Sequence, residues 1–326
     1  MEIKPEAPRK ILVITDGRAG NEVQAVSLAQ AVRSRVSGAT SQVLRADIAQ
    51  WMQPLPPAIL HRLGLGVSSL GSSCLKTVDR FDPDLIVGAG RRVAAGVAGI
   101  SRRSGCAAVQ LMDPKMALGA FHSLIVPAHD ELSAPNVLTT IGALTQLNSE
   151  TLRSEAAEWQ DKLPAYGLGV LIGGPSKSAP FPEAEQDRFV SALIRLAEAH
   201  SLLITPSRRS PERLLLNLRN HLPKNKEHFF WDGSGENPYR AIMGSSEAFL
   251  VTADSVNMAT EVASTGKPLH VFELPNLAPK LQRFHDSLAQ RGASRPFVGE
   301  IEAWDYEPLA EADRAAEWLI ERLGWA

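Results

Sequence analysis

The sequence predicts an α/β protein with two domains, and three observations support this. The chain has 326 residues, enough for two domains of about 150 residues each. Short apolar runs alternate with amphipathic helical segments in both halves, which is the pattern of parallel α/β folds. The composition, 44 % hydrophobic and 21 % charged, is that of a globular protein. We therefore expect two Rossmann-like domains that face each other across a cleft, lined by the loops at the carboxyl ends of the strands.

The first half shows one complete strand-and-helix unit, which we assign to residues 1–155. Residues 11–15 form an apolar run typical of a buried strand. The segment after it places apolar side chains on one helical face, namely Ala25, Leu28, Ala29, Val32 and Val36. Further strands are expected at 84–90, 107–113 and 123–130.

The second half repeats the pattern after a polar connector at 154–167, and we assign it to residues 156–304. Its predicted helix covers 183–199, and its predicted strands are 168–174, 202–207, 227–232, 248–254 and 268–274. A separate C-terminal segment, 305–326, contains a helix at about 309–323. Its apolar stripe consists of Leu309, Ala312, Ala316, Leu319, Ile320 and Leu323.

Composition narrows the class of protein. A net charge of -2 argues against a nucleic-acid-binding protein, which usually has a basic excess. Cys74 and Cys106 are the only two cysteines and lack metal-ligand spacing, so we expect neither a disulfide framework nor a zinc site. So few cysteines fit a protein of the reducing cytoplasm. The start MEIKPEAPRK has no signal-peptide core. We expect a cytoplasmic protein, with residues 51–66 either a packed loop or a peripheral contact with the inner face of a membrane.

Residues 251–268 contain the strongest signal for nucleotide binding. Asp254 and Ser255 lie where a strand passes into a helix, and such a helix start offers unpaired N–H groups to a phosphate. Met258 lies in the first turn of this helix. Glu261 follows Asp254 by seven residues on the same face, about 10 Å along the axis, where a carboxylate can accept hydrogen bonds from ribose hydroxyls. The alternative is an ordinary helix cap with a solvated glutamate.

Two other loops of the second half suit an anion. In GGPSKS, Gly173 and Gly174 permit close backbone approach, and Ser176 adds a hydroxyl. The loop lacks the spacing of a Walker motif. In TPSRRSPE, Ser207, Arg208 and Arg209 follow the next strand, where a guanidinium can hold a phosphate or remain a surface charge.

The loop DGRAGNE after the first strand is a candidate for catalysis. Asp16 and Glu22 are acids beside a helix start, where a carboxylate suits a general base acting on a hydroxyl. The rest of the loop consists of Gly17, Arg18, Gly20 and Asn21. The alternative is a simple strand-to-helix turn capped by Asn21. His129 and Asp130 are possible metal ligands, but no second histidine cluster at ligand spacing accompanies them, so we expect no metal site.

Five ordered motifs resemble the elongated-mitochondria fission family of plants and bacteria over nearly the whole chain. They are ITDGRAGNEVQAVSLAQAV, IVPAHD, IGGPS, TPSRRSP and VTADSVNMATEVASTGKPLHV. That family is similar to glycosyltransferases of the GT-B fold. The resemblance implies that Glu261 binds the ribose, that the diphosphate lies near Ser255, and that the acceptor and a base, Glu22 or Asp16, lie at the DGRAGNE loop. It also implies a last helix that returns to the first domain.

Together these observations predict a metal-independent, cofactor-free GT-B glycosyltransferase. It would transfer a sugar from a nucleotide-diphosphate donor to a hydroxyl acceptor on a lipid or an envelope glycan. Two alternatives stay open. Plant members of the family are linked to mitochondrial division through a dynamin-like partner, so the chain would instead be a non-catalytic interaction protein that recruits a membrane-remodelling protein. A sugar-nucleotide epimerase shares the two-domain architecture.

Overall fold

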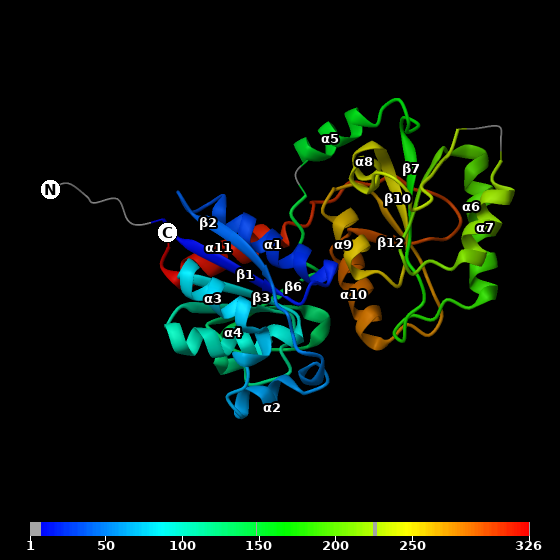
Figure 1. Cartoon of the computed structure of the whole chain (residues 1–326). Coiled ribbons are helices and arrows are strands. Elements are labelled where there is room, and N and C mark those ends of the chain that lie inside the picture. The colour runs from blue at the N-terminus through cyan, green and yellow to red at the C-terminus, as the bar shows by residue number, and fades with distance from the viewer. Residues whose placement is uncertain (1–7, 148, 224–226, 326) are drawn as a thin grey trace. The chain divides into compact units, whose positions relative to one another are not determined.

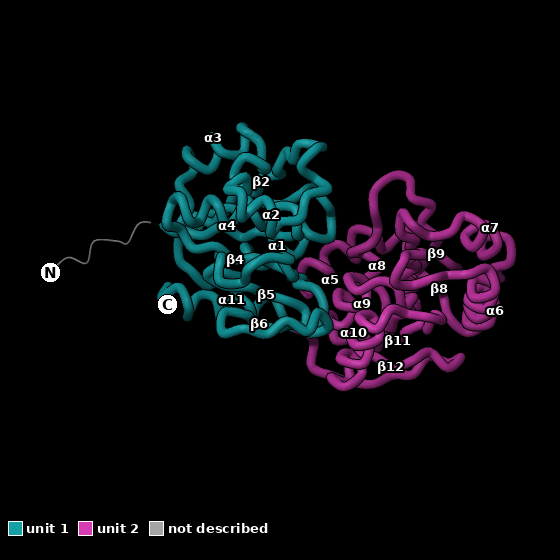
Figure 2. The backbone as a smooth tube through the Cα atoms, turned by 90° about the horizontal axis from the view of Figure 1, so that it is seen from below, with its two compact units in different colours: residues 1–146, 310–326 teal, residues 147–309 magenta. Residues whose placement is uncertain are grey.

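The computed structural model describes residues 8–147, 149–223 and 227–325. The chain divides into two compact units, coloured separately in Figure 2. Unit 1 comprises residues 1–146 and 310–326, and unit 2 comprises residues 147–309. Unit 1 is therefore built from two separate stretches of chain, whereas unit 2 is continuous.

Unit 1 is built on a six-stranded parallel sheet in the order β2-β1-β3-β4-β5-β6. Its strands are β1 (Lys10–Thr15), β2 (Thr40–Arg45), β3 (Leu85–Ala89), β4 (Ala107–Leu111), β5 (Ser123–Pro127) and β6 (Val137–Thr140). Its helices are α1 (Ala19–Arg33), α2 (Pro57–Arg62), α3 (Ser72–Phe81), α4 (Arg91–Ser104) and α11 (Glu311–Leu323). Single-turn helices lie at η1 (Gln50–Met52), η2 (Ser68–Leu70), η3 (Leu118–Ala120) and η4 (Ala128–Asp130).

Helices cover both faces of this sheet (Figure 1), and side chains that alternate between the two faces form two cores. Ile11 and Val13 of β1 point to the face covered by α1 and α11, whereas Leu12 and Ile14 point to the face covered by α3 and α4. Because both faces are buried, the central strands are continuous apolar runs, and this is why they stand out in the sequence.

Helix α11 packs against α1 and completes the first of these cores. Ala312, Ala316 and Leu319 are buried among α1 side chains. At the edge of the contact, the Arg35 guanidinium lies 2.8 Å from the Asp313 carboxylate and 3.2 Å from that of Glu317. The end of the chain is thus part of the core of unit 1.

Unit 2 has a second six-stranded parallel sheet, in the order β12-β11-β10-β7-β8-β9. Its strands are β7 (Gly167–Ile172), β8 (Leu202–Pro206), β9 (Phe229–Phe230), β10 (Ser246–Thr252), β11 (Leu269–Phe272) and β12 (Ser294–Pro296). Its helices are α5 (Ser149–Glu158), α6 (Glu183–Ala199), α7 (Glu212–His221), α8 (Tyr239–Ser245), α9 (Val256–Ala263) and α10 (Pro279–Gln290). Phe189 of α6 packs edge-on against Phe272 of β11, with ring centroids 4.7 Å apart.

The predicted α/β fold with two Rossmann-like domains is confirmed, and the differences from the sequence expectations are local. Helix 183–199 has the expected bounds. The first helix ends at Arg33, so Val36 lies just beyond it, and the last helix begins at Glu311 rather than 309. Only Phe229 and Phe230 form a strand within 227–232, and β2, β6 and β12 were not predicted.

Candidate functional site

The two sheets have topological switch points, at which ligands of open α/β sheets usually bind. In unit 2 the chain proceeds outward from β7 to β8 and β9, and in the opposite direction from β10 to β11 and β12. The switch point therefore lies between β7 and β10. In unit 1 it lies between β1 and β3. The predicted site residues lie in the loops at the carboxyl ends of these strands and of β8, or in the first two turns of the helices that follow, α1 and α9.

At the switch point of unit 2, the carboxylate of Asp254 joins two loops. One oxygen, Oδ2, accepts hydrogen bonds from Gly174 N at 2.9 Å and from Arg209 Nη2 at 3.0 Å. The other, Oδ1, accepts one from Thr252 Oγ1 at 2.7 Å, and Gly173 N donates to the same hydroxyl at 2.8 Å. The Asp254 side chain is fully buried. Its charge is thus paired, and its geometry is that of a structural link rather than a free ligand.

The start of α9, beside this link, retains free backbone donors. Ser255 is its N-cap, and its Oγ accepts from Met258 N at 3.4 Å. Within the described residues, the N–H groups of Val256 and Asn257 meet no acceptor, as is usual in the first turn of a helix. Since the first turn carries no acidic side chain, these two groups can bind an anion.

The two arginines of the loop after β8 lie in different environments. Arg209 pairs with Asp254, and its Nη1 also donates to the Gly174 carbonyl at 3.1 Å. Arg208 is exposed and forms no hydrogen bond or ion pair with a described residue. Ser207 Oγ accepts from Arg209 N at 3.2 Å. In the neighbouring loop, Ser176 Oγ accepts from backbone N–H groups at 178 and 179 and so shapes its own turn. Arg208 is therefore the arginine that remains available to a ligand.

Glu261, in the second turn of α9, is half-buried and has a partner that sequence reasoning missed. The hydroxyl of Tyr239, the first residue of α8, donates a short hydrogen bond to Glu261 Oε2. Burial raises the pKa of the Glu261 carboxyl, although the Tyr239 hydrogen bond and Arg240 act in the opposite direction. Burial and the nearby carboxylate raise the pKa of the Tyr239 hydroxyl well above its usual value. A ribose hydroxyl at Glu261 would have to replace or share this tyrosine.

At the switch point of unit 1, Asp16 is bonded to its own loop. Its Oδ1 accepts from Asn21 Nδ2 at 2.9 Å, and Arg18 Nε lies 3.5 Å from Oδ2. Gly90, at the end of β3, has φ 89°, and a Cβ there would lie 2.4 Å from Asn21 Nδ2. Asn21 thus binds Asp16 and packs on β3 instead of capping α1, for which Arg18 occupies the N-cap position. Gly17, at φ 75°, is exposed, and the Gly20 carbonyl accepts from Gln24 Nε2 at 3.2 Å.

Glu22, on the first turn of α1, is paired with Arg45 of β2. The guanidinium contacts both carboxylate oxygens, at 2.8 and 2.7 Å, and Thr15 Oγ1 donates to Oε2 at 3.3 Å. The Arg45 hydrogen bonds are the main cause of a lowered Glu22 pKa. A carboxylate held in this way is a weaker proton acceptor. Since Asp16 is also paired, with Asn21 and Arg18, both predicted acids already have partners.

The described residues contain no group of three or more His, Cys, Asp or Glu side chains that could hold a metal ion. His129 is buried in η4 and Asp130 is half-buried beside it. In the part of the chain that the structure describes, no helix is both long and apolar enough to span a bilayer.

Comparison with known proteins gives a family and a fold. The family model described as Mitochondrial fission ELM1 matches residues 19–323. The mitochondrial fission protein ELM1 of Arabidopsis thaliana is 29 % identical over 286 residues, which cover 77 % of this chain and 67 % of that protein. The UDP-GlcNAc 2-epimerase of Methanocaldococcus jannaschii superposes with a TM-score of 0.65 at 11 % identity, covering 97 % and 100 % of the two chains. Acinetobacter baumannii MurG gives 0.51 at 13 % identity, covering 97 % and 92 %. The GT-B-like fold is thereby confirmed.

Proposed function

This chain belongs to the Mitochondrial fission ELM1 family, and from its GT-B-like fold and the geometry of unit 2 we propose that it is a glycosyltransferase. In this proposal, unit 2 binds a nucleotide-diphosphate sugar and unit 1 provides the acceptor side. The acceptor is a hydroxyl of a lipid or an envelope glycan. Solved structures of similar fold include enzymes named for UDP-GlcNAc, which supports a nucleotide sugar as the ligand class.

One observation carries the proposal, namely the switch point of unit 2. There the buried Asp254 holds the Gly174 loop in place beside the start of α9, and the Val256 and Asn257 N–H groups have no acceptor among the described residues. A diphosphate bound there would accept from these donors, with the positive end of the helix dipole behind them. Glu261, on the same helix, would accept from the ribose.

The proposed reaction is a single sugar transfer. The acceptor oxygen attacks the anomeric carbon of the donor, the bond from that carbon to the phosphate oxygen breaks, and the nucleoside diphosphate leaves with the electron pair. Asp16, or else Glu22, takes the acceptor proton. The helix start and Arg208 stabilise the charge that develops on the departing diphosphate, so the proposal requires no metal ion.

Calorimetric titration of the full chain with UDP-, GDP-, CMP- and ADP-sugars tests the donor site. We expect one base to bind, and Glu261→Gln to weaken that binding by about tenfold, the order of a hydrogen bond to a charged group. Glu198→Gln, which removes an exposed acid of α6, is the matched control and leaves affinity unchanged. A panel that gives no heat with any donor would refute the glycosyltransferase proposal.

A second candidate function is a non-catalytic interaction protein, and the pairing of the predicted acids favours it. Arg45 holds Glu22, Arg209 holds Asp254, and Tyr239 holds Glu261. Chromatography of products separates the candidates. A transferred sugar supports the first proposal, an epimerised nucleotide sugar indicates an epimerase, and an unchanged donor with every acceptor class supports the interaction protein.

A further inference from the structure

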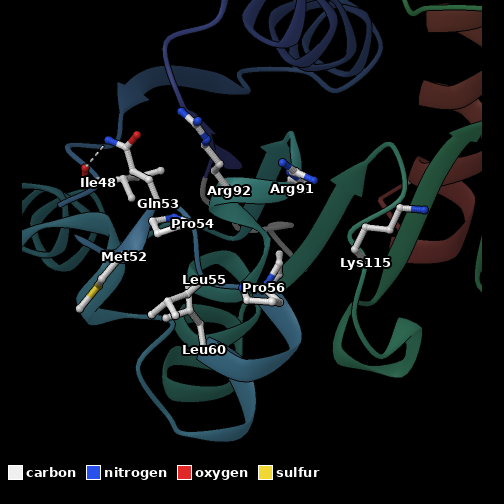
Figure 3. Close-up of a pocket in the computed structure, with 11 residues that line it drawn as sticks. Ile48, Met52, Gln53, Pro54, Leu55, Pro56, Leu60, Arg91, Arg92 and Lys115 are labelled. Atoms are coloured by element: carbon white, nitrogen blue, oxygen red, sulfur yellow. Dashed lines mark hydrogen bonds between the residues drawn. The ribbon is translucent and has the colours of Figure 1, made fainter. Parts of the chain in front are cut away.

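Unit 1 contains a pocket of about 170 Å³ that none of the predicted nucleotide-binding residues lines (Figure 3). One wall comes from the segment 48–60, which overlaps residues 51–66, for which the sequence left a packed loop or a membrane contact open. The other comes from the start of α4 and the loop after β4. The lining combines apolar side chains with three cationic ones: Ile48, Met52, Leu55 and Leu60, three prolines at 54, 56 and 57, Gln53, and Arg91, Arg92 and Lys115.

The cationic wall carries charge that the protein does not balance. Arg91 and Arg92 are the first two residues of α4, and neither forms an ion pair or hydrogen bond with a described residue. The first turn of α4 has no acidic side chain. Cations at a helix N-terminus oppose the helix dipole, so this arrangement is unfavourable until an anion binds. Lys115 is different, because its ammonium lies 2.6 Å from the Asp113 carboxylate.

The segment that forms the apolar wall has both buried and exposed apolar side chains. Met52 and Leu60 are buried and Leu55 is half-buried, and in Figure 3 they lie on the side of the pocket opposite Arg91 and Arg92. From the same segment and the end of α2, Trp51 and Leu63 are 63 % and 64 % exposed. The segment that lines the pocket therefore also presents apolar side chains to the solvent.

The size of the pocket limits what it holds. At about 170 Å³ it is smaller than pockets that enclose a whole drug-sized ligand, which are roughly 300–1,000 Å³. It has room for roughly five or six water-sized groups of ~30 Å³ each, enough for a phosphate and a few carbon atoms. A complete nucleotide sugar does not fit, so this pocket and the predicted donor site take different ligands.

We propose that this pocket binds the phosphate end of an anionic amphiphile, with the phosphate at Arg91 and Arg92 and the hydrocarbon chain along Met52, Leu55 and Leu60. The next step, that the amphiphile is the acceptor, rests on the proposed function. It has geometric support, because α4 begins directly after Gly90, against which Asn21 packs while its amide binds Asp16.

Calorimetry of the full chain with octyl phosphate below its micelle concentration tests the site. Inorganic phosphate and octyl glucoside serve as probes that lack the chain and the charge, respectively. We expect octyl phosphate to bind at least about tenfold more tightly than either, since it alone contacts both walls. Absence of octyl phosphate binding, or inorganic phosphate that binds as tightly, would overturn the proposal.

Variants locate the binding. Arg91→Gln and Arg92→Gln should each weaken octyl phosphate binding by about tenfold, and Leu55→Ser should weaken octyl phosphate but not inorganic phosphate. Arg102→Gln, an exposed arginine near the other end of α4, is the matched control. Removing a cation from the helix start should not lower the melting temperature, so a loss of binding is separable from a loss of fold. Octyl phosphate binding that survives both arginine substitutions contradicts this location.

Titration of the same variants with the donor panel separates this proposal from the proposed function. If octyl phosphate binds and no nucleotide sugar does, the amphiphile site stands and the transferase falls. If a nucleotide sugar binds and octyl phosphate does not, the glycosyltransferase proposal stands and the amphiphile site is refuted.

Discussion

The two units share a topology but use the same position in the sheet differently. Each places an aspartate after a strand at its switch point, Asp16 after β1 and Asp254 shortly after β10. Both carboxylates are buried, with side chains 0 % exposed for Asp254 and 3 % exposed for Asp16, but Asp254 joins two loops, whereas Asp16 pairs only with its near neighbours in the chain, Arg18 and Asn21. The comparison shows that a buried carboxylate at a switch point can tie separate loops together or serve its own segment alone. We infer that unit 2 has a preformed site and unit 1 an adaptable one.

Deleting residues 310–326 should produce the largest difference in stability between the two units. The deletion removes α11, whose buried Leu319 and Ile320 alone account for about 3–6 kcal/mol of burial. That loss is comparable to the whole stability of an ordinary domain, about 5–15 kcal/mol. We expect limited proteolysis to cleave unit 1 while residues 147–309 stay intact. Arg35→Gln, which breaks only the peripheral ion pairs with α11, is the control, and equal resistance of both units would contradict the contribution assigned to α11.

Removing the two aspartates should have unequal effects. Asp254→Ala leaves the buried Gly174 N–H and Thr252 hydroxyl without their acceptor, which should cost about 3 kcal/mol of unfolding free energy. Asp16→Ala should cost about 1 kcal/mol, because it removes the acceptor of one side-chain amide, that of Asn21, while its other partner, Arg18, is 60 % exposed and can turn to water. Urea unfolding measures both. Equal losses would show that Asp254 is not the link between the loops.

Replacing either of two loop glycines by alanine should destabilise the protein, for a different reason in each case. A Cβ at Gly173 would lie 2.1 Å from Asp254 Oδ1, so Gly173→Ala should cost about 2 kcal/mol and weaken donor binding. Gly17 has no atom within 4 Å of its Cβ position but has φ 75°, so Gly17→Ala should cost about 1 kcal/mol of backbone strain. Asparagine tolerates positive φ. Gly17→Asn should therefore recover stability in urea unfolding and Gly173→Asn should not.

Two glutamates should respond to pH in opposite directions, with the smallest effects. The folded-state pKa of Glu22 is lowered, so its pairing stabilises unit 1 above the unfolded pKa, about 4.3, and this contribution is lost as pH falls through the folded value. The folded-state pKa of Glu261 is raised by burial, so its contribution falls as pH rises from about 4.3. At pH 7, Glu22→Gln should destabilise by at most about 1 kcal/mol, and Glu261→Gln should not destabilise. Urea unfolding at pH 7 and pH 3 should show the Glu22 difference shrink on acidification; a difference that grows would contradict the pairing.

The sequence predicted those parts of the fold that are buried on both sides. The central strands appear in the sequence as apolar runs. Helix 183–199 is recognisable from the periodic spacing of its apolar residues. Strand β2 escaped prediction because Thr40–Arg45 is an edge strand with no buried side chain, and only its pairing with β1 defines it.

The candidate site was predictable as a set of loops but not as a set of contacts. Strand-end motifs led to Gly173, Asp254 and Glu261, because parallel strands bring their carboxyl ends to one edge. Arg208 and Arg209 are equivalent in a sequence, yet only Arg209 reaches Asp254. The Tyr239 partner of Glu261 lies 22 residues away on another helix, a distance that no local pattern reports.

The return of α11 to unit 1 has a consequence for the order of folding in the cell. The ribosome releases the strands of unit 1 first, but the α1 face that α11 covers stays open until residues 310–326 emerge. At about 5–20 residues per second, synthesis of the intervening unit takes roughly 10–30 s. Unit 2, being continuous, can complete its own core in that interval. Unit 1 is thus synthesised first but completes its core last, and until then the apolar face of α1 is accessible to chaperones.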